Sequence, residues 1–185
     1  MAKQNKLNKY LKLFSCIIIC ELAGFLGSLF TTPAIGGWYK NLSKPFFSPP
    51  NWIFGPVWSV LFILMGVSLY LVWSEKWVVR FQIGKIKKKL WNSFSQKLWT
   101  GSWSRANIIL IFYLQLFLNI LWSFLFFGMH SPVLAFFEIL MLWCAIIFTI
   151  VNFYRVSKTA AYLLIPYIAW VSFATILNYL LWILN

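Results

Sequence analysis

Residues 52–73 read WIFGPVWSVLFILMGVSLYLVW and contain no charged side chain. A helix needs roughly 20 predominantly apolar residues to cross the hydrocarbon core of a bilayer, and this stretch is long enough. Because lipid offers no hydrogen-bond partners, a spanning segment must satisfy its backbone groups internally, as a helix does. The stretch therefore predicts a transmembrane helix.

The rest of the chain repeats this pattern. Four further stretches of similar length and composition lie at residues 13–30, 108–127, 133–153 and 160–184. The sequence thus predicts an all-α integral membrane bundle of five transmembrane helices, built as a single domain over residues 1–185. Pro132 is expected in the first turn of the fourth helix, where its missing N–H breaks no bond. Pro166 is expected inside the fifth, where it predicts a kink.

Composition supports a membrane protein. Of the 185 residues, 62% are hydrophobic and 10% charged, against about 45–50% and about 25% in soluble domains. A soluble enzyme, a disordered chain and a disulfide scaffold are excluded. Cys16, Cys20 and Cys144 all lie in apolar stretches and indicate no disulfide framework. With His130 the only histidine, we expect no metal site and no cofactor.

Basic residues predict the orientation. Fourteen of the 16 Lys and Arg residues fall before the first span, in residues 74–107 and in the turn near residue 155, which five spans place on one side. Only Lys40 and Lys44 fall on the other side. Cytoplasmic loops are enriched in Lys and Arg. The N-terminus is therefore expected in the cytoplasm and the C-terminus outside, across a bacterial-type inner membrane.

The segment 74–107 mixes basic with apolar residues. Ile83, Ile86, Leu90 and Phe94 follow a helical spacing, and the lysines lie largely off that line. This pattern predicts a basic amphipathic helix on the anionic cytoplasmic leaflet, with nucleic acid or a regulatory partner as alternatives. Of these alternatives, nucleic acid is the less favoured, because so apolar a chain has too few polar residues for a soluble basic face. We therefore expect no nucleic acid as a partner.

Polar side chains within the spans predict a cavity. At about 1.5 Å per residue, one set lies within roughly 9–14 Å of the outer helix ends: Trp58, Asn119, Trp122, Glu138 and Asn178. Trp170 lies deeper, near mid-bilayer. Several placements in one half of the membrane favour a single cavity beneath the outer loop. The alternative is that Asn119 and Asn178 form interhelical hydrogen bonds, at about 0.6 kcal/mol each.

The first span carries its own polar feature. Glu21 lies within it, and a carboxyl group at membrane depth marks a functional site by default. Gly24, Gly27 and Ser28 follow at small-residue spacing. Such spacing is typical of a close helix contact or a dimer seam.

Tryptophans inside the spans are not explained by interfacial belts. Trp58, Trp122, Trp143 and Trp170 lie well within the predicted helices. Indoles that face a cavity suit a flat, apolar, polycyclic ligand. Trp143 is interpreted as facing lipid or another subunit.

These residues form motifs that resemble one family. The motifs, in chain order, are Trp38-Tyr39, Lys44-Pro45, Pro49-Pro50-Asn51-Trp52-x-Phe54-Gly55-Pro56-Val57-Trp58, Met65-Gly66, Gln115-x-x-x-Asn119-x-x-Trp122-Ser123-x-x-Phe126-Phe127, Glu138 and Pro166-Tyr167-x-x-Trp170-x-x-Phe173-Ala174-Thr175-x-x-Asn178. The chain resembles the TspO/MBR family, the tryptophan-rich sensory and translocator proteins, across all five spans.

The resemblance implies a five-helix bundle, usually a homodimer, with a ligand pocket capped by the first loop. Family ligands include porphyrins such as protoporphyrin IX, cholesterol and benzodiazepine-type drugs. Carried onto matching positions, the pocket would be lined by Trp38, Trp58, Asn119, Trp122, Trp170 and Ala174. With Glu138 and Asn178 from the polar cluster, these residues are the predicted ligand-binding site.

Three functions are predicted, the first two from this resemblance. The first is a receptor or transporter for a tetrapyrrole, with Lys40 or Lys44 pairing with its propionates. The second is a porphyrin-degrading enzyme, because Trp58 and Trp170 match tryptophans implicated in porphyrin breakdown in some bacterial members. The third is an interaction protein that recruits a partner through residues 74–107, which exceed the family's usual short linker.

Sterol is the less favoured ligand class. The cholesterol pattern of animal members needs a basic residue after its tyrosine, and none follows Tyr179. Besides the ligand, the expected partners are membrane lipid and a second copy of the chain.

Overall fold

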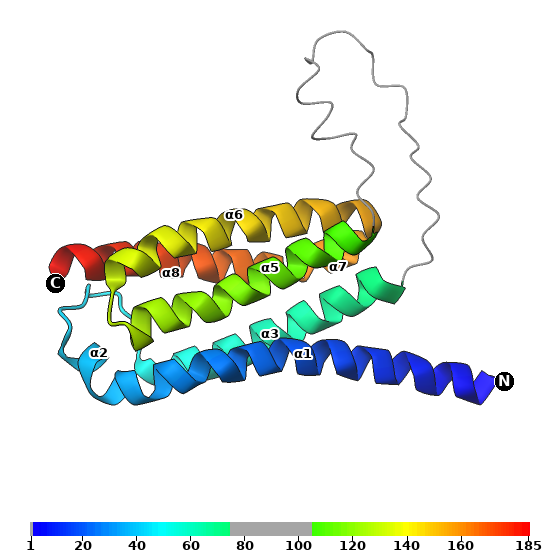
Figure 1. Ribbon diagram of the computed structural model, residues 1–185, viewed down its shortest axis with the longest axis horizontal. Coiled ribbons are helices and arrows are strands. Elements are labelled where there is room, and N and C mark those ends of the chain that lie inside the picture. The colour runs from blue at the N-terminus through cyan, green and yellow to red at the C-terminus, as the bar shows by residue number, and fades with distance from the viewer. Residues whose placement is uncertain (1, 75–104) are drawn as a thin grey trace, which may run out of the picture.

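The computed structural model describes residues 2–74 and 105–185 of the chain (Figure 1). Every regular element in these residues is helical. The elements are α1 (Ala2–Gly36), α2 (Trp38–Asn41), α3 (Asn51–Ser74), α5 (Arg105–Ser123), the π-helical turn η1 (Phe124–Gly128), α6 (Pro132–Val156), α7 (Lys158–Tyr162) and α8 (Ile165–Leu184). The predicted amphipathic helix falls in residues 75–104, outside the described part.

The five predicted spans are confirmed as long apolar helices. Those able to cross a membrane run over Leu7–Gly36, Asn51–Ser74, Ala106–Gly128, Pro132–Val156 and Lys158–Leu184. Large apolar side chains cover their outer surface, including Phe14, which is 61% exposed, and Leu110, which is 67% exposed. Such a surface is suited to lipid rather than water.

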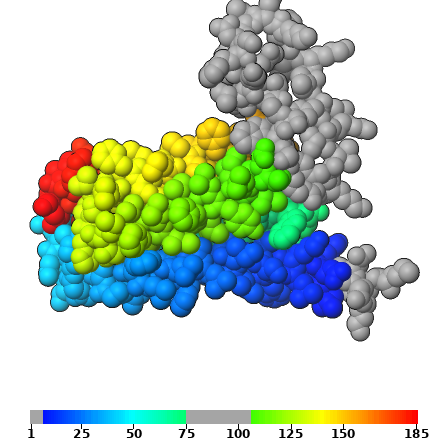
Figure 2. All heavy atoms as spheres, viewed as in Figure 1, coloured from blue at the N-terminus to red at the C-terminus, as the bar shows by residue number. Residues whose placement is uncertain are grey.

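The helices form a bundle with the two termini at opposite ends (Figure 1). Helix α1 packs against α3 and α5, α5 packs against α6, and α6 packs against α8. Helices α1, α5 and α6 lie side by side on one face of the molecule (Figure 2). We call the end with α2 and the C-terminus the α2 end, and the opposite end the α7 end.

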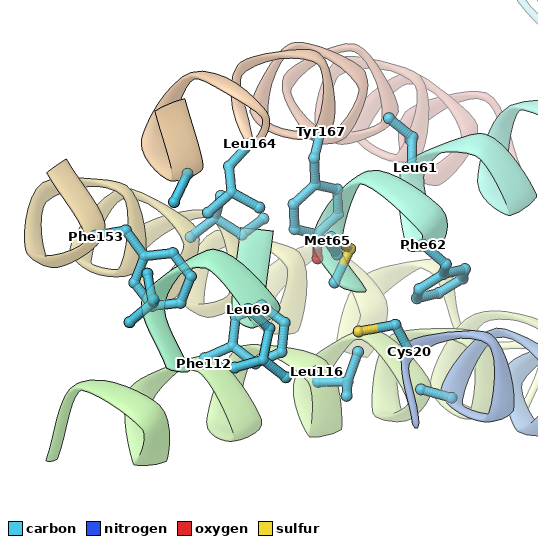
Figure 3. Close-up of a cluster of buried hydrophobic side chains, with 14 of the residues drawn as sticks. Cys20, Leu61, Phe62, Met65, Leu69, Phe112, Leu116, Phe153, Leu164 and Tyr167 are labelled. Carbon is cyan, nitrogen blue, oxygen red and sulfur yellow. The ribbon is translucent and has the colours of Figure 1, made fainter. Parts of the chain in front are cut away.

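An apolar core holds the helices together toward the α7 end. Figure 3 shows side chains from α3, α5, α6 and α8 converging there, among them Met65, Phe112, Phe153 and Tyr167, which are fully buried. Phe112 and Phe153 stack at 5.6 Å between ring centroids. Nearby, the Ser68 hydroxyl donates to the Ala160 carbonyl at 2.7 Å, joining α3 to α7.

Two helix boundaries differ from the sequence predictions. Helix α1 runs from Ala2 to Gly36, well beyond residues 13–30 at both ends, and α2 forms inside the predicted loop. Hydropathy reports only the part of a helix that lies in lipid, whereas Lys, Leu and Gln continue a helix readily. Gly36 and Gly37 come at the end of α1, as expected for glycine at a helix C-terminus.

The two prolines behave differently. Pro132 occupies the first turn of α6, which Ser131 caps by accepting from the Leu134 N–H at 3.4 Å, as predicted. The prediction that Pro166 lies inside a kinked helix is wrong. The last span is divided into α7 and α8, and Pro166 lies in the first turn of α8. There its missing N–H leaves no intrahelical bond unmade.

Candidate functional site

A cavity of about 400 Å³ lies toward the α2 end of the bundle. Helices α1, α3, α5 and α8, the turn η1 and Tyr39 of α2 form its walls. No residue of α6 lines it, because α6 packs behind α5 and α8. Its size is within the range of roughly 300–1,000 Å³ typical of small-molecule sites.

Most of the predicted site residues meet at this cavity. Six of them line it: Trp58, Asn119, Trp122, Trp170, Ala174 and Asn178. They come from helices α3, α5 and α8. Four of the five residues that the depth estimate grouped together, all except Glu138, are among them.

Two predicted residues lie elsewhere, which corrects the expected lining. Trp38 packs beside the cavity and stacks on His130, with ring centroids 4.6 Å apart. Its neighbour Tyr39 faces the cavity instead, because successive helical residues point about 100° apart. Glu138 is 2% exposed on α6, and neither carboxyl oxygen has a hydrogen-bond partner in the described structure.

Aromatic rings give the cavity flat walls. Trp58 stacks on Phe62 with centroids 5.6 Å apart, and Trp122 stacks on Phe126 at 5.2 Å. Trp170 of α8 meets Phe54 of α3 edge to face at 6.1 Å between ring centroids. Paired rings hold one another in place, so the cavity offers fixed faces for stacking.

Asn119 and Asn178 line the cavity and also form interhelical hydrogen bonds. The two interpretations given for them from the sequence therefore both hold. The Trp122 Nε1–H donates to Asn178 Oδ1 at 3.1 Å, and Asn178 Nδ2 donates to the Pro132 carbonyl at 2.7 Å. Asn119 Nδ2 donates to the Tyr167 hydroxyl at 3.1 Å. These bonds join α5, α6 and α8 around one side of the cavity.

Comparison with known proteins places this architecture in a family. A model of the TspO/MBR family matches residues 16–183. The chain belongs to the TspO/MBR family. With its five apolar helices, this TspO/MBR protein is an integral, multi-pass membrane protein.

Relatives of this TspO/MBR chain come from distant organisms. It is 38% identical to "Tryptophan-rich protein TspO" of Archaeoglobus fulgidus, over 95% of this chain and 97% of the relative. It is 37% identical to the human "Translocator protein", over 88% of this chain and 83% of the relative. It is 30% identical to "Tryptophan-rich sensory protein" of Cereibacter sphaeroides, over 77% of this chain and 73% of the relative.

The segment between α2 and α3 closes the α2 end of this TspO/MBR bundle. Ser43 N–H donates to Asn185 Oδ1 at 2.9 Å, and Asn185 Nδ2 donates to the Ser43 carbonyl at 3.1 Å. Lys44 Nζ lies 4.2 Å from the centroid of the Tyr39 ring, while Lys40 is exposed. Burial raises the pKa of the Tyr39 hydroxyl, which keeps it neutral. A lysine thus lies beside a residue of the cavity wall.

The small residues of α1 make contacts within the chain. A Cβ added at Gly24 would lie 2.5 Å from the Phe62 ring, and one at Gly27 would lie 3.1 Å from the Ser123 hydroxyl. Gly24, Gly27 and Ser28 all line the cavity. The close helix contact, one of the two interpretations of this spacing, is therefore present inside one chain.

Several lining residues were not assigned to the site from the sequence. Tyr39, Phe54 and Phe126 line the cavity, and all three stand in the family motifs quoted above. Glu21 also lines it, and its position in a span already marked it as unusual. The sequence therefore marked these residues as unusual, through the family motifs or through the position of Glu21 in a span. It did not indicate the direction in which their side chains point.

The remaining predicted features lie away from the cavity. Trp143 is 36% exposed, and its Nε1–H donates to the Ser172 hydroxyl at 2.8 Å. Cys16 and Cys20 are buried free thiols in the core. No group of three or more His, Cys, Asp or Glu side chains in the described residues is arranged to hold a metal ion.

Proposed function

We propose that this TspO/MBR protein is a membrane receptor or transporter that binds a tetrapyrrole such as protoporphyrin IX in the cavity. One observation carries the proposal: indole and phenyl rings from α3, α5, η1 and α8 surround a single cavity of about 400 Å³. A flat, largely apolar macrocycle gains most from such walls, because stacking and burial act together.

Charge near the cavity is consistent with a ligand that carries carboxylates. Lys44 lies against Tyr39 at the α2 end, and no Lys or Arg of the described residues lines the cavity itself. A porphyrin would therefore direct its propionates toward Lys44 and its ring into the cavity. Sterols and drug-like molecules have a smaller flat surface to stack on the indoles, or they lack a carboxylate that could pair with Lys44. We therefore rank both classes behind tetrapyrroles.

Replacing both Trp58 and Trp170 by Phe is expected to weaken protoporphyrin binding about tenfold, since each aromatic contact is worth about 0.5–1.5 kcal/mol. The measurement is quenching of tryptophan fluorescence on titration of detergent-purified protein. Changing Trp143 and Trp182 to Phe is the matched control, because it removes the same number of indoles outside the cavity. Equal affinity in the two double variants would count against the site.

A second candidate function is porphyrin breakdown, favoured by the placement of Trp58 and Trp170 on the walls of one cavity. Illuminating the porphyrin complex with and without oxygen distinguishes it from binding alone. A product band that forms faster than from free porphyrin, and is lost in the Trp58 and Trp170 double variant, would support the enzyme. If bound and free porphyrin broke down at equal rates, the enzyme would be excluded and the proposal of a receptor or transporter would remain.

Topology and assembly remain predictions of the same proposal. We infer from the basic residues that the N-terminus lies in the cytoplasm and the C-terminus outside, across a bacterial-type inner membrane. A homodimer is expected by family precedent. Recruitment of a partner by residues 74–107, of which residues 75–104 lie outside the described part, stays the third hypothesis.

A further inference from the structure

Glu21 forms part of the floor of the cavity. It lies near the middle of the span Leu7–Gly36, and of the α1 residues that line the cavity it is nearest the α7 end. Phe62, Asn119 and Trp170 are the corresponding innermost residues of α3, α5 and α8. The carboxyl group therefore stands at the deepest level of the cavity.

Within residues 2–74 and 105–185, the carboxyl group of Glu21 lines a cavity that contains no Lys or Arg side chain. Its Oε1 is buried and accepts no hydrogen bond in the described structure. Among the described residues that line the cavity, Glu21 is the only charged one. A carboxyl group at this depth in a bilayer is costly unless something pairs with it.

Three polar side chains of the cavity wall donate their hydrogen bonds within the protein and not to Glu21. On α1, the Ser28 hydroxyl donates to the Phe25 carbonyl at 2.7 Å, and the Thr31 hydroxyl donates to the Gly27 carbonyl at 3.1 Å. On the floor, Asn119 Nδ2 donates to the Tyr167 hydroxyl. None of these three bonds satisfies the buried Oε1 of Glu21, and a complementary ligand would bring a donor to it.

Aromatic faces complete the surroundings of the carboxyl group. The Phe62 ring lies against Gly24, one helical turn from Glu21, and Trp58 stacks on Phe62. Rings of this kind attract cations through their negative faces. A carboxylate beside stacked aromatic rings is a favourable setting for a flat cation.

We propose that Glu21 is the counter-ion of a cationic subsite on the cavity floor. The subsite takes flat aromatic ligands whose inner end carries a protonated amine or a comparable N–H donor. The inference rests on the proposed function only in that the cavity binds a flat aromatic ligand. It adds a polarity to that site, with the cationic end at Glu21 and any carboxylate near Lys44.

The test uses two probes with the same ring system, 9-aminoacridine, which is protonated at mildly alkaline pH, and acridine, which is neutral there. Their binding to the detergent-purified full chain is measured by equilibrium dialysis with detergent on both sides. Wild-type protein is expected to prefer the amine. Glu21→Gln should weaken binding of 9-aminoacridine about tenfold, because a charge-assisted hydrogen bond is lost. The affinity for acridine should stay within about twofold of the wild-type value.

Glu138→Gln is the matched control, since this second membrane carboxyl lies outside the cavity. The inference is overturned if wild-type protein shows no preference for the amine, if Glu21→Gln weakens both probes equally, or if Glu138→Gln gives the same selective loss. Protoporphyrin is titrated in parallel. Protoporphyrin binding without amine selectivity would remove this inference alone, and amine selectivity without protoporphyrin binding would remove the tetrapyrrole proposal alone.

Discussion

Gly66→Ala is expected to lower the free energy of unfolding by about 3 kcal/mol, at the upper end of the usual cost of overpacking. The added Cβ would lie 2.6 Å from Ile17 Cα, 2.9 Å from Ile17 N and 3.0 Å from the Cys16 carbonyl oxygen. These are backbone atoms of α1, which have no rotamer through which to move aside. Helices α1 and α3 would have to separate, and the buried contacts of Cys16 and Met65 would loosen with them.

Gly55→Ala is the control on the same helix. Among the residues that the structure describes, no atom outside its own turn lies within 4 Å of a Cβ at this position. Alanine also favours a helix over glycine by about 1 kcal/mol, so this variant should be as stable as wild type or more so. Unfolding of both variants is followed in detergent by circular dichroism against denaturant. Wild-type stability of Gly66→Ala would show that α1 and α3 do not cross as closely as described.

The fold was predictable because the bilayer fixes a length. A stretch such as residues 52–73 has to be helical and has to cross, whatever its neighbours do. The ends of the helices were less predictable, because leaving the lipid does not end a helix, as the extension of α1 to Gly36 illustrates. At Pro166 the chain restarted a helix instead of kinking one, a choice that depends on packing against neighbouring helices.

The height of a residue in the membrane was predictable, and the direction of its side chain was not. Counting along each helix placed Trp58, Asn119 and Asn178 at one level, and all three line the cavity. The same count also placed Glu138 at this level, but Glu138 is buried in the protein on α6 and does not line the cavity. Rotation about a helix axis is set by tertiary packing, which no single span encodes.

Ala174→Trp is expected to reduce protoporphyrin affinity at least about 100-fold, a loss of about 2.7 kcal/mol. Ala174 is a small residue of α8 on the cavity wall, beside the turn that carries Trp170. An indole at this position would occupy much of a cavity of about 400 Å³. The ligand would then be excluded by volume, which costs more than the loss of any one contact to it.

Ile176→Trp introduces the same side chain two residues further along α8, where Ile176 is 56% exposed on the outer surface. Residues two apart in a helix face nearly opposite sides, so this variant should bind protoporphyrin within about twofold of wild type. Affinity is measured by quenching, and circular dichroism checks that both variants remain helical. If Ala174→Trp bound as tightly as Ile176→Trp, the ligand would have to lie elsewhere on the bundle, because no ligand can share space with an indole.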